Sequence, residues 1–155
     1  MLQKARLTLH LEHKQDVWPH EARPEVRLLQ EWGLGSSPQE AIWVIAYDAQ
    51  KHLRTAVEVS RGMHTSVDLH MPTLLAAVLL SGSERFMIAH NHPSGDPTPT
   101  PTDLLFTSYV RQAADVCQLY LEDHIIVTPR KTKWISMVDE RLYAPPAYIN
   151  TELTA

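Results

Sequence analysis

Cysteine is almost missing from this sequence: Cys117 is the single one among 155 residues. One cysteine cannot form a disulfide within the chain, so a secreted scaffold held by internal disulfides is excluded and a reducing, cytoplasmic location is expected. Long apolar runs are missing too, because the longest, residues 74–80, is far shorter than the roughly 20 residues that span a bilayer. The N-terminus lacks the apolar region of a secretory signal, and we expect no membrane partner.

A surplus of basic residues is also missing. Lysine and arginine total 14 against 18 aspartate and glutamate residues, which gives a net charge of −4. Because proteins that bind duplex nucleic acid usually carry a basic surplus, the overall charge does not support nucleic acid as a partner, although a local basic patch stays open. The hydrophobic fraction of 44% is ordinary for a globular protein, and the length favours one main domain.

The most informative segment begins with a pair of histidines, His90 and His92. The short apolar run 86–89 before them predicts a buried strand. Residues i and i+2 of a strand point to the same face, so both imidazoles can be aimed at one point. Pro93 has no N–H to give and ends the strand, and Ser94 begins a turn.

Asp103 follows in the first turn of a predicted helix. Two histidine nitrogens and one carboxylate oxygen, with a water in the fourth position, make an open zinc site of the catalytic kind. A closed structural site would need a fourth protein ligand, and no cysteine lies nearby. The segment from Thr100 to Asp103 is also a good helix start by itself, with Thr100 as N-cap and Pro101 at the first helical position. The two interpretations are compatible.

With this spacing, His90-x-His92-Pro93 followed by Thr100-x-x-Asp103 resembles the JAMM (MPN-plus) metal-binding motif, with threonine where that family has serine. The string HNHPSGDP, the TPTD after it and the later DHII resemble the RadC-type branch, over roughly residues 25 to 140. The resemblance implies an α/β fold of the MPN, cytidine-deaminase-like type: three layers, with a mixed sheet and helices on both faces. Longer RadC-like proteins carry a helix-hairpin-helix region before this domain, and this chain resembles the short, stand-alone form.

The resemblance also implies a mechanism. His90, His92 and Asp103 would hold Zn²⁺, Glu40 would be the general base just before the first long strand, and Thr100 would donate a hydrogen bond to the oxyanion. Relatives of this kind cut peptide or isopeptide bonds. We therefore expect a zinc metallohydrolase that acts on a protein or peptide substrate, whose identity no stretch of the sequence reveals.

Other polar residues are candidates for smaller roles. Glu58 is the competing candidate for the base. Ser94 and Asp123 are candidates for hydrogen-bonding to the metal ligands, although Asp123 is equally suited to capping a turn, and we favour that structural role. His64 and His70 lie in a loop from which either could reach the site, but a lone loop histidine is more often solvated.

Other function classes were weighed against the hydrolase. The letters of His90-Asn91-His92 also spell the HNH nucleases, but in that motif the three residues are dispersed and not consecutive. A zinc deaminase needs a P-C-x-x-C motif, which a single cysteine excludes. A metal-dependent nuclease or DNA-repair factor of mobile elements, and a non-catalytic MPN interaction module, stay open as alternatives.

The domain plan places the metal site in the middle of one unit. We expect an N-terminal extension over 1–23 with an edge strand at 7–11, an MPN/JAB domain over 24–143, and an extended tail over 144–155. Within the domain the apolar patterns predict helices and strands. The helices are expected at 24–32, 72–80 and 101–118, with a helical turn at 138–143, and the strands at 41–48, 53–60, 86–92, 124–128 and 134–136.

Overall fold

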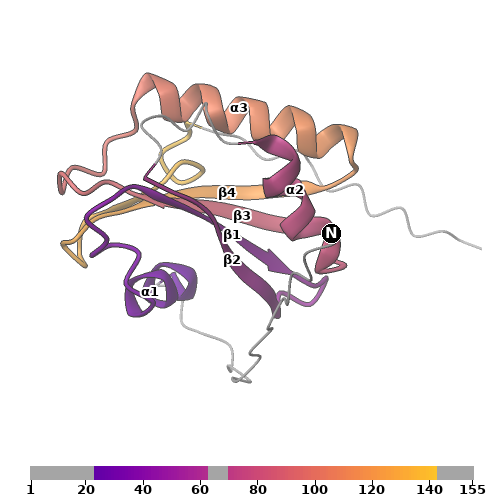
Figure 1. The fold of residues 1–155 in the computed structure, drawn as a ribbon, viewed down its shortest axis with the longest axis horizontal. Helices are drawn as coiled ribbons and strands as arrows, with labels where there is room; N and C mark the ends of the chain where they lie inside the picture. The colour runs from indigo at the N-terminus through magenta and orange to yellow at the C-terminus, as the bar shows by residue number, and fades with distance from the viewer. Residues whose placement is uncertain (1–22, 63–69, 143–155) are drawn as a thin grey trace, which may run out of the picture.

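The computed structural model of the protein describes residues 23–62 and 70–142 (Figure 1). The edge strand expected at 7–11, the tail expected from 144 and the candidate His64 therefore lie outside the described residues.

Every helix and strand expected within the described ranges is present, with small shifts at the ends. The helices are α1 (Pro24–Glu31), α2 (Met71–Leu80) and α3 (Pro101–Val116), and the strands are β1 (Ala41–Tyr47), β2 (Leu53–Arg61), β3 (Arg85–Asn91), β4 (Tyr120–Val127) and β5 (Trp134–Ser136). The largest shift is in β4, which begins at Tyr120 and not at His124 because its first residues pair with the start of β3. Of the helical turn expected at 138–143, the described residues 138–142 form a turn and a bend and no helix.

The strands form one mixed sheet in the order β2-β1-β3-β4-β5. β1 is antiparallel to both of its neighbours, β2 and β3, whereas β3 and β4 are parallel and β4 and β5 are antiparallel. Helix α3 makes the crossover that the parallel pair β3–β4 requires. Helix α2 makes the crossover expected before the histidine strand, and it joins β2 to β3 with β1 between them.

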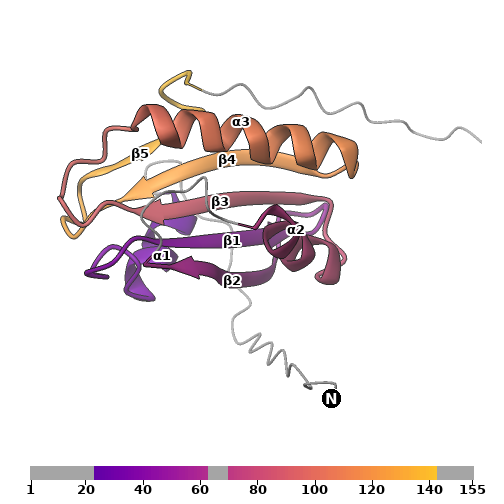
Figure 2. The same cartoon turned by 45° about the horizontal axis from the view of Figure 1, so that its top comes forward.

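The sheet is covered on both faces, which gives three layers (Figures 1 and 2). Helix α1 packs on one face, where Leu29 meets Ile45 and Ile125 in an apolar cluster. Helices α2 and α3 pack on the other face, and residues such as Phe106 and Ile88 form a second cluster there. The expected α/β fold, with a mixed sheet between helices, is thus confirmed, and the central strands are apolar because both of their faces are buried.

Helix α2 departs from the expectation that a helix apolar almost all round is buried. Leu74, Leu75 and Val78 face the sheet and are buried, but Leu79 and Leu80 at the C-terminal end are 54% and 74% exposed. The helix covers the sheet with one face only, so the remaining apolar side chains have no layer above them. None of the helices in the described ranges is long and apolar enough to cross a membrane.

Candidate metal centre

His90 and His92 stand at the end of β3, at the edge where the chain turns toward α3. His90 points to the α3 face of the sheet, as Ile88 does two residues earlier. The backbone N–H of His92 donates to Val127 at 2.9 Å, so the extended conformation continues past the last residue of the strand. The two imidazoles therefore share one face, and their Nε2 atoms lie 2.9 Å apart. Both residues are buried.

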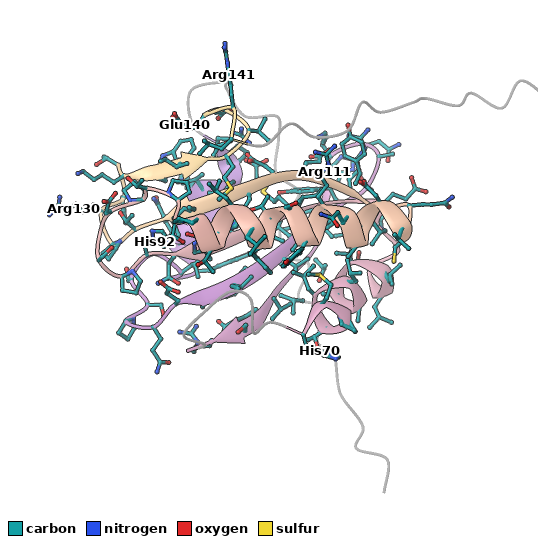
Figure 3. All side chains as sticks on the ribbon, turned by 90° about the horizontal axis from the view of Figure 1, so that it is seen from above. His70, His92, Arg111, Arg130, Glu140 and Arg141 are labelled. Atoms are coloured by element: carbon teal, nitrogen blue, oxygen red, sulfur yellow. The ribbon has the colours of Figure 1, made fainter. Side chains whose placement is uncertain are left out.

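Asp103 is brought to the histidine pair by the first turn of α3 (Figure 3, where His92 is labelled beside the start of that helix). Thr100 is the N-cap: its Oγ1 accepts from the N–H of Asp103 at 3.2 Å, and its own N–H donates to Asp103 Oδ2 at 2.8 Å. This capping box satisfies two backbone donors that a helix start leaves free. The Thr100 hydroxyl also donates to Oδ2 at 2.6 Å. The helix-start interpretation is confirmed, and the same bonds fix the carboxylate.

Two of the three distances between the donor atoms match the spacing around a tetrahedral metal ion, and the third, 2.9 Å between the two Nε2 atoms, is shorter. Asp103 Oδ1 is 3.3 Å from His90 Nε2, and Asp103 Oδ2 is 3.4 Å from His92 Nε2. Ligand atoms about 2.0–2.2 Å from a tetrahedral ion stand about 3.3–3.5 Å from one another. The donor set therefore fits a divalent metal such as zinc. In the described part of the chain no fourth histidine, cysteine or carboxylate joins the group, which leaves a coordination position open.

The charges around the site favour a cation. Burial alone would raise the pKa of the Asp103 carboxyl, but its close contacts with the rings of His90 and His92 and the hydrogen bond from Thr100 outweigh burial and hold that pKa well below its usual range. Asp103 is therefore a carboxylate at any physiological pH, although it is buried. An anionic oxygen beside two imidazole nitrogens is a donor set that zinc takes readily.

His92 presents Nε2 to the site because its other nitrogen is committed. Nδ1 lies 2.8 Å from the carbonyl oxygen of Asp96, which can only accept, so Nδ1 carries the hydrogen. Burial alone would lower the pKa of His92, but the hydrogen bond to Asp103, the one to Asp96 and the charges of Asp103 and Glu40 outweigh burial and raise it. Negative charge thus draws positive charge toward Nε2, and a bound metal would take the place of a proton there.

Glu40 reaches the edge of this site through the register of the sheet. β1 and β3 pair with Ile42 opposite His90, where the paired register begins, and Glu40 precedes Ile42 by two residues. The carbonyl of Glu40 accepts from the N–H of Gly62 at 2.8 Å, which holds its backbone beside the end of β2. Glu40 is exposed, and its charge contributes to the raised pKa of His92. It lies close to the metal ligands yet remains accessible to solvent.

Asn91, between the two histidines, ties this Glu40 segment to the histidine strand. Strand alternation turns its side chain away from the metal ligands, and it is fully buried. Its Oδ1 accepts from the N–H of Ala41 at 2.8 Å, and its Nδ2 donates to the carbonyls of Ser37 and Gln39 at 3.1 and 3.2 Å. The backbone on both sides of Glu40 is therefore held by one amide.

Replacing Asn91 with alanine is expected to lower the free energy of unfolding by about 2 kcal/mol, because the buried N–H of Ala41 and the carbonyl of Ser37 lose the partner that Asn91 supplies, while the carbonyl of Gln39 keeps the hydroxyl of Ser37. Chemical denaturation of the metal-free protein measures this loss. Gln112→Ala is the matched control, since Gln112 is an exposed amide on α3, and its effect should stay within about 0.5 kcal/mol. Equal stabilities for the two variants would contradict the conclusion that Asn91 holds the backbone on both sides of Glu40.

Glu58, the competing candidate for the base, is directed elsewhere. It pairs with Trp43 across β1 and β2, and Trp43 packs against the α1 face of the sheet, opposite to His90. Its two carboxylate oxygens accept from Arg61 at 2.7 and 2.5 Å. Glu58 is thus on the wrong face for the histidine pair and already holds a cation.

Ser94 and Asp123 have no contact with the metal ligands among those found in the described ranges. Ser94 is exposed in the turn after His92, and its hydroxyl accepts from the N–H of Asp96 at 3.3 Å. Asp123 faces the α1 side, where its carboxylate accepts from Arg23 at 2.9 Å and from Ser136 at 2.6 Å. Of the two roles considered for Asp123, the contacts fit the structural one, because neighbouring residues of a strand point to opposite faces.

His70 also lies apart from the site. It stands at the residue before α2, and its Nδ1 is 3.2 Å from the hydroxyl of Thr73. Figure 3 labels His70 and His92 on separate parts of the molecule.

Sequence reasoning missed His124 as a neighbour of the ligands. It was considered only as part of the DHII string and as the start of a strand, but its Nε2 lies 2.7 Å from His90 Nδ1. His124 is fully buried on β4, opposite Ile88 of β3. A polar residue at the head of a fully apolar run was the available signal, since a buried polar group must find a partner.

Comparison with known proteins places this geometry in a family. Residues 23–142 match the RadC-like JAB domain family. A UPF0758 protein of Aromatoleum aromaticum is 36% identical over 95 residues, which cover 61% of this chain and 42% of that protein. UPF0758 proteins of Carboxydothermus hydrogenoformans and Coprothermobacter proteolyticus are 34% and 32% identical, over 71% and 67% of this chain and 48% and 43% of their own lengths. The chain thus spans less than half the length of these relatives. Because the family match covers most of the chain, including the whole histidine and aspartate site, this protein belongs to the RadC-like JAB domain family.

Proposed function

We propose that this protein is a zinc-dependent hydrolase of the JAMM type that cuts a peptide or isopeptide bond. The observation that carries the proposal is the convergence of His90, His92 and Asp103 on one point with a coordination position left open. Structural zinc sites in proteins are closed by four protein ligands, whereas catalytic sites keep a position for water or substrate.

The metal would be held by the Nε2 atoms of His90 and His92 and by the carboxylate of Asp103. Zinc bound at such a site supplies Lewis acidity, which makes a water molecule acidic enough to attack a carbonyl near neutral pH. The pKa of Asp103, held low by its partners, keeps this ligand anionic near neutral pH.

Glu40 is the residue we assign to proton transfer. It is exposed, its charge contributes to the raised pKa of His92, and it takes a proton from the attacking water. When the C–N bond breaks, the same carboxyl gives that proton to the leaving amine. The hydroxyl of the water then belongs to the new carboxylic acid and the proton to the new amine. The hydrogen bonds of the Asn91 side chain to Ala41 and Gln39 tie the backbone on both sides of Glu40 to the histidine strand.

Thr100 is the residue we assign to the developing oxyanion. Its hydroxyl is exposed at the start of α3 and in the resting protein donates to Asp103 Oδ2. To donate to the oxyanion, the hydroxyl must turn away from Asp103 Oδ2. That oxygen still accepts a hydrogen bond from the backbone N–H of Thr100. The interaction is therefore made only as charge develops on the substrate, which is the condition for accelerating the chemical step.

The choice of a peptide or isopeptide bond rests on the resemblance to JAMM hydrolases, since the printed names of the curated relatives state no activity. The test is a screen of peptides and isopeptide-linked peptides with protein from zinc-replete cells, in which new amines and carboxylates are identified by mass spectrometry. We expect cleavage that a chelator abolishes and added zinc restores, and that His92→Ala protein, purified in parallel, lacks. Zinc-dependent cleavage of DNA with intact peptides would contradict the proposal.

A further inference from the structure

A chain of three hydrogen bonds runs from the metal ligand His90 into the core and returns to the backbone of Asp103. His90 Nδ1 lies 2.7 Å from His124 Nε2, and His124 Nδ1 lies 2.6 Å from the hydroxyl oxygen of Thr107. Thr107 Oγ1 in turn lies 2.6 Å from the carbonyl oxygen of Asp103, one turn earlier on α3. His124 is fully buried and Thr107 is 3% exposed, so water does not compete for these bonds.

We call this chain of hydrogen bonds from His90 through His124 and Thr107 to Asp103 the relay. Its end at the carbonyl of Asp103 determines which atom is the donor in each of the three bonds. A carbonyl oxygen can only accept, so the Thr107 hydroxyl donates its single proton there. Two other acceptors lie within reach of the Thr107 hydroxyl: His124 Nδ1 at 2.6 Å and the weaker thioether sulfur of Met137 at 3.3 Å. Giving the proton to either would leave the oxygens of Thr107 and Asp103 2.6 Å apart with no hydrogen between them. Having given its proton away, Thr107 must accept from His124, and Nδ1 of His124 therefore carries a hydrogen.

The position of the hydrogen on His124 determines which nitrogen of His90 carries a hydrogen. His124 is fully buried and its two ring partners, His90 and Thr107, carry no negative charge, so the ring is neutral and has one donor and one acceptor nitrogen. With its hydrogen on Nδ1, His124 accepts at Nε2, and His90 must donate from its own Nδ1. The Nε2 of His90 is then bare, and it lies 2.9 Å from the Nε2 of His92 and 3.3 Å from the carboxylate of Asp103.

We propose that His124 and Thr107 are positioning residues that fix His90 in the tautomer with its hydrogen on Nδ1 and so present Nε2 to the metal. The proposal rests on the metal site of the proposed function but not on the reaction or the substrate. His92 needs no such partner, because the carbonyl of Asp96 already fixes its tautomer. The opposite polarity of the relay would place a hydrogen on His90 Nε2 and block the coordination position.

The direct test is the tautomer of His90 in the metal-free protein. Long-range ¹H–¹⁵N spectra of protein labelled at histidine report which ring nitrogen is protonated. We expect the hydrogens of His90 and His124 both on Nδ1 in the wild type, and a mixture of tautomers at His90 in Thr107→Val. Finding the hydrogen of His90 on Nε2 in the wild type would overturn the proposal. Because this readout needs neither metal nor substrate, it decides the relay even if the proposed hydrolase activity fails.

The second test is zinc affinity, measured by competition with a chromogenic chelator. Loss of a hydrogen-bond partner behind a ligand histidine typically weakens metal binding about 10- to 100-fold. We expect a loss of this size for His124→Leu and for Thr107→Val. Thr107→Ser keeps the hydroxyl and should stay near wild type, and His124→Gln keeps an acceptor that His90 can use and should recover most of the affinity. Met137→Leu is the control, because it removes the sulfur that competes for the Thr107 hydroxyl and leaves the three hydrogen bonds between His90, His124, Thr107 and Asp103 in place.

The variants also separate positioning from folding. Melting curves of the metal-free proteins show which variants keep the fold, and Thr107→Val, nearly identical in shape to the native residue, covers the case in which His124→Leu does not fold. Folded Thr107→Val protein with wild-type zinc affinity and a wild-type His90 tautomer would overturn the proposal. A wild type that binds no zinc would instead refute the proposed metal site, while the tautomer measurement would still decide the relay.

Discussion

Glu40→Gln protein is expected to bind zinc and fold as the wild type does, and to lose turnover by about 10²- to 10⁴-fold on whichever amide substrate the screen identifies. Glutamine keeps the size of the side chain and removes only its ability to take a proton. Glu40 is exposed, its charge acts on His92, and it is not part of the donor group of His90, His92 and Asp103. The base can thus be removed without removing a ligand.

Glu58→Gln is the matched control for this experiment. It makes the same chemical change in a carboxylate on β2 that binds Arg61 on the other face of the sheet, so turnover should stay near wild type. Metal analysis and a melting curve accompany both variants. If Glu40→Gln lost its zinc, or kept full turnover while Glu58→Gln lost it, the assignment of the base would be wrong.

Thr100 gives the second large effect, because its two jobs respond differently to substitution. Thr100→Ala removes both the helix cap and the hydroxyl, and we expect about 0.5–2 kcal/mol less stability and about 10²- to 10³-fold slower turnover. Thr100→Asn should keep the cap, since asparagine caps well, and yet lose most of the activity. Thr100→Ser keeps cap and hydroxyl, and it should be nearly silent in stability and equal or faster in rate.

Melting curves and turnover of the three Thr100 variants, each loaded with zinc, separate the two jobs. The capping box around Asp103 is the physical basis of the stability effect. Thr100→Asn with wild-type activity would show that the residue is a cap and nothing more, and the oxyanion donor would have to be sought elsewhere.

The grouping of His90, His92 and Asp103 could be predicted from the sequence because both of the rules involved are local. A strand sends His90 and His92 to one face, and a proline-containing helix start places Asp103 in the first turn, whatever the rest of the chain does. The α/β architecture followed from apolar strands that alternate with helical patterns, and it is confirmed by the sheet and its two helical layers.

The partners behind the ligands could not be predicted, because they depend on how distant strands align. His124 meets His90 only through the parallel register of β3 and β4, which includes an irregularity between Phe86 and Met87. A shift of one residue would turn Asp123 to the metal side in place of His124, and nothing in the DHII string itself chooses between them. Asn91 could be expected to point away from the ligands, but its three partners lie in the segment before β1, far from it in sequence.

Surface exposure was predicted poorly for a related reason. The apolar pattern of α2 gave no sign that Leu79 and Leu80 would be exposed, since the pattern records which side chains are apolar and not where the covering layers end.

The central claim is that His90, His92 and Asp103 form a metal site, and elemental analysis of the purified protein tests it most directly. Protein from zinc-replete expression should carry about one zinc ion per chain, as a site with three protein ligands implies. His92→Ala should lose that zinc and keep its far-ultraviolet circular dichroism, because His92 stands at the edge of the sheet beyond the last residue of β3. Sub-stoichiometric metal in the wild type, or unchanged metal in His92→Ala, would contradict the account.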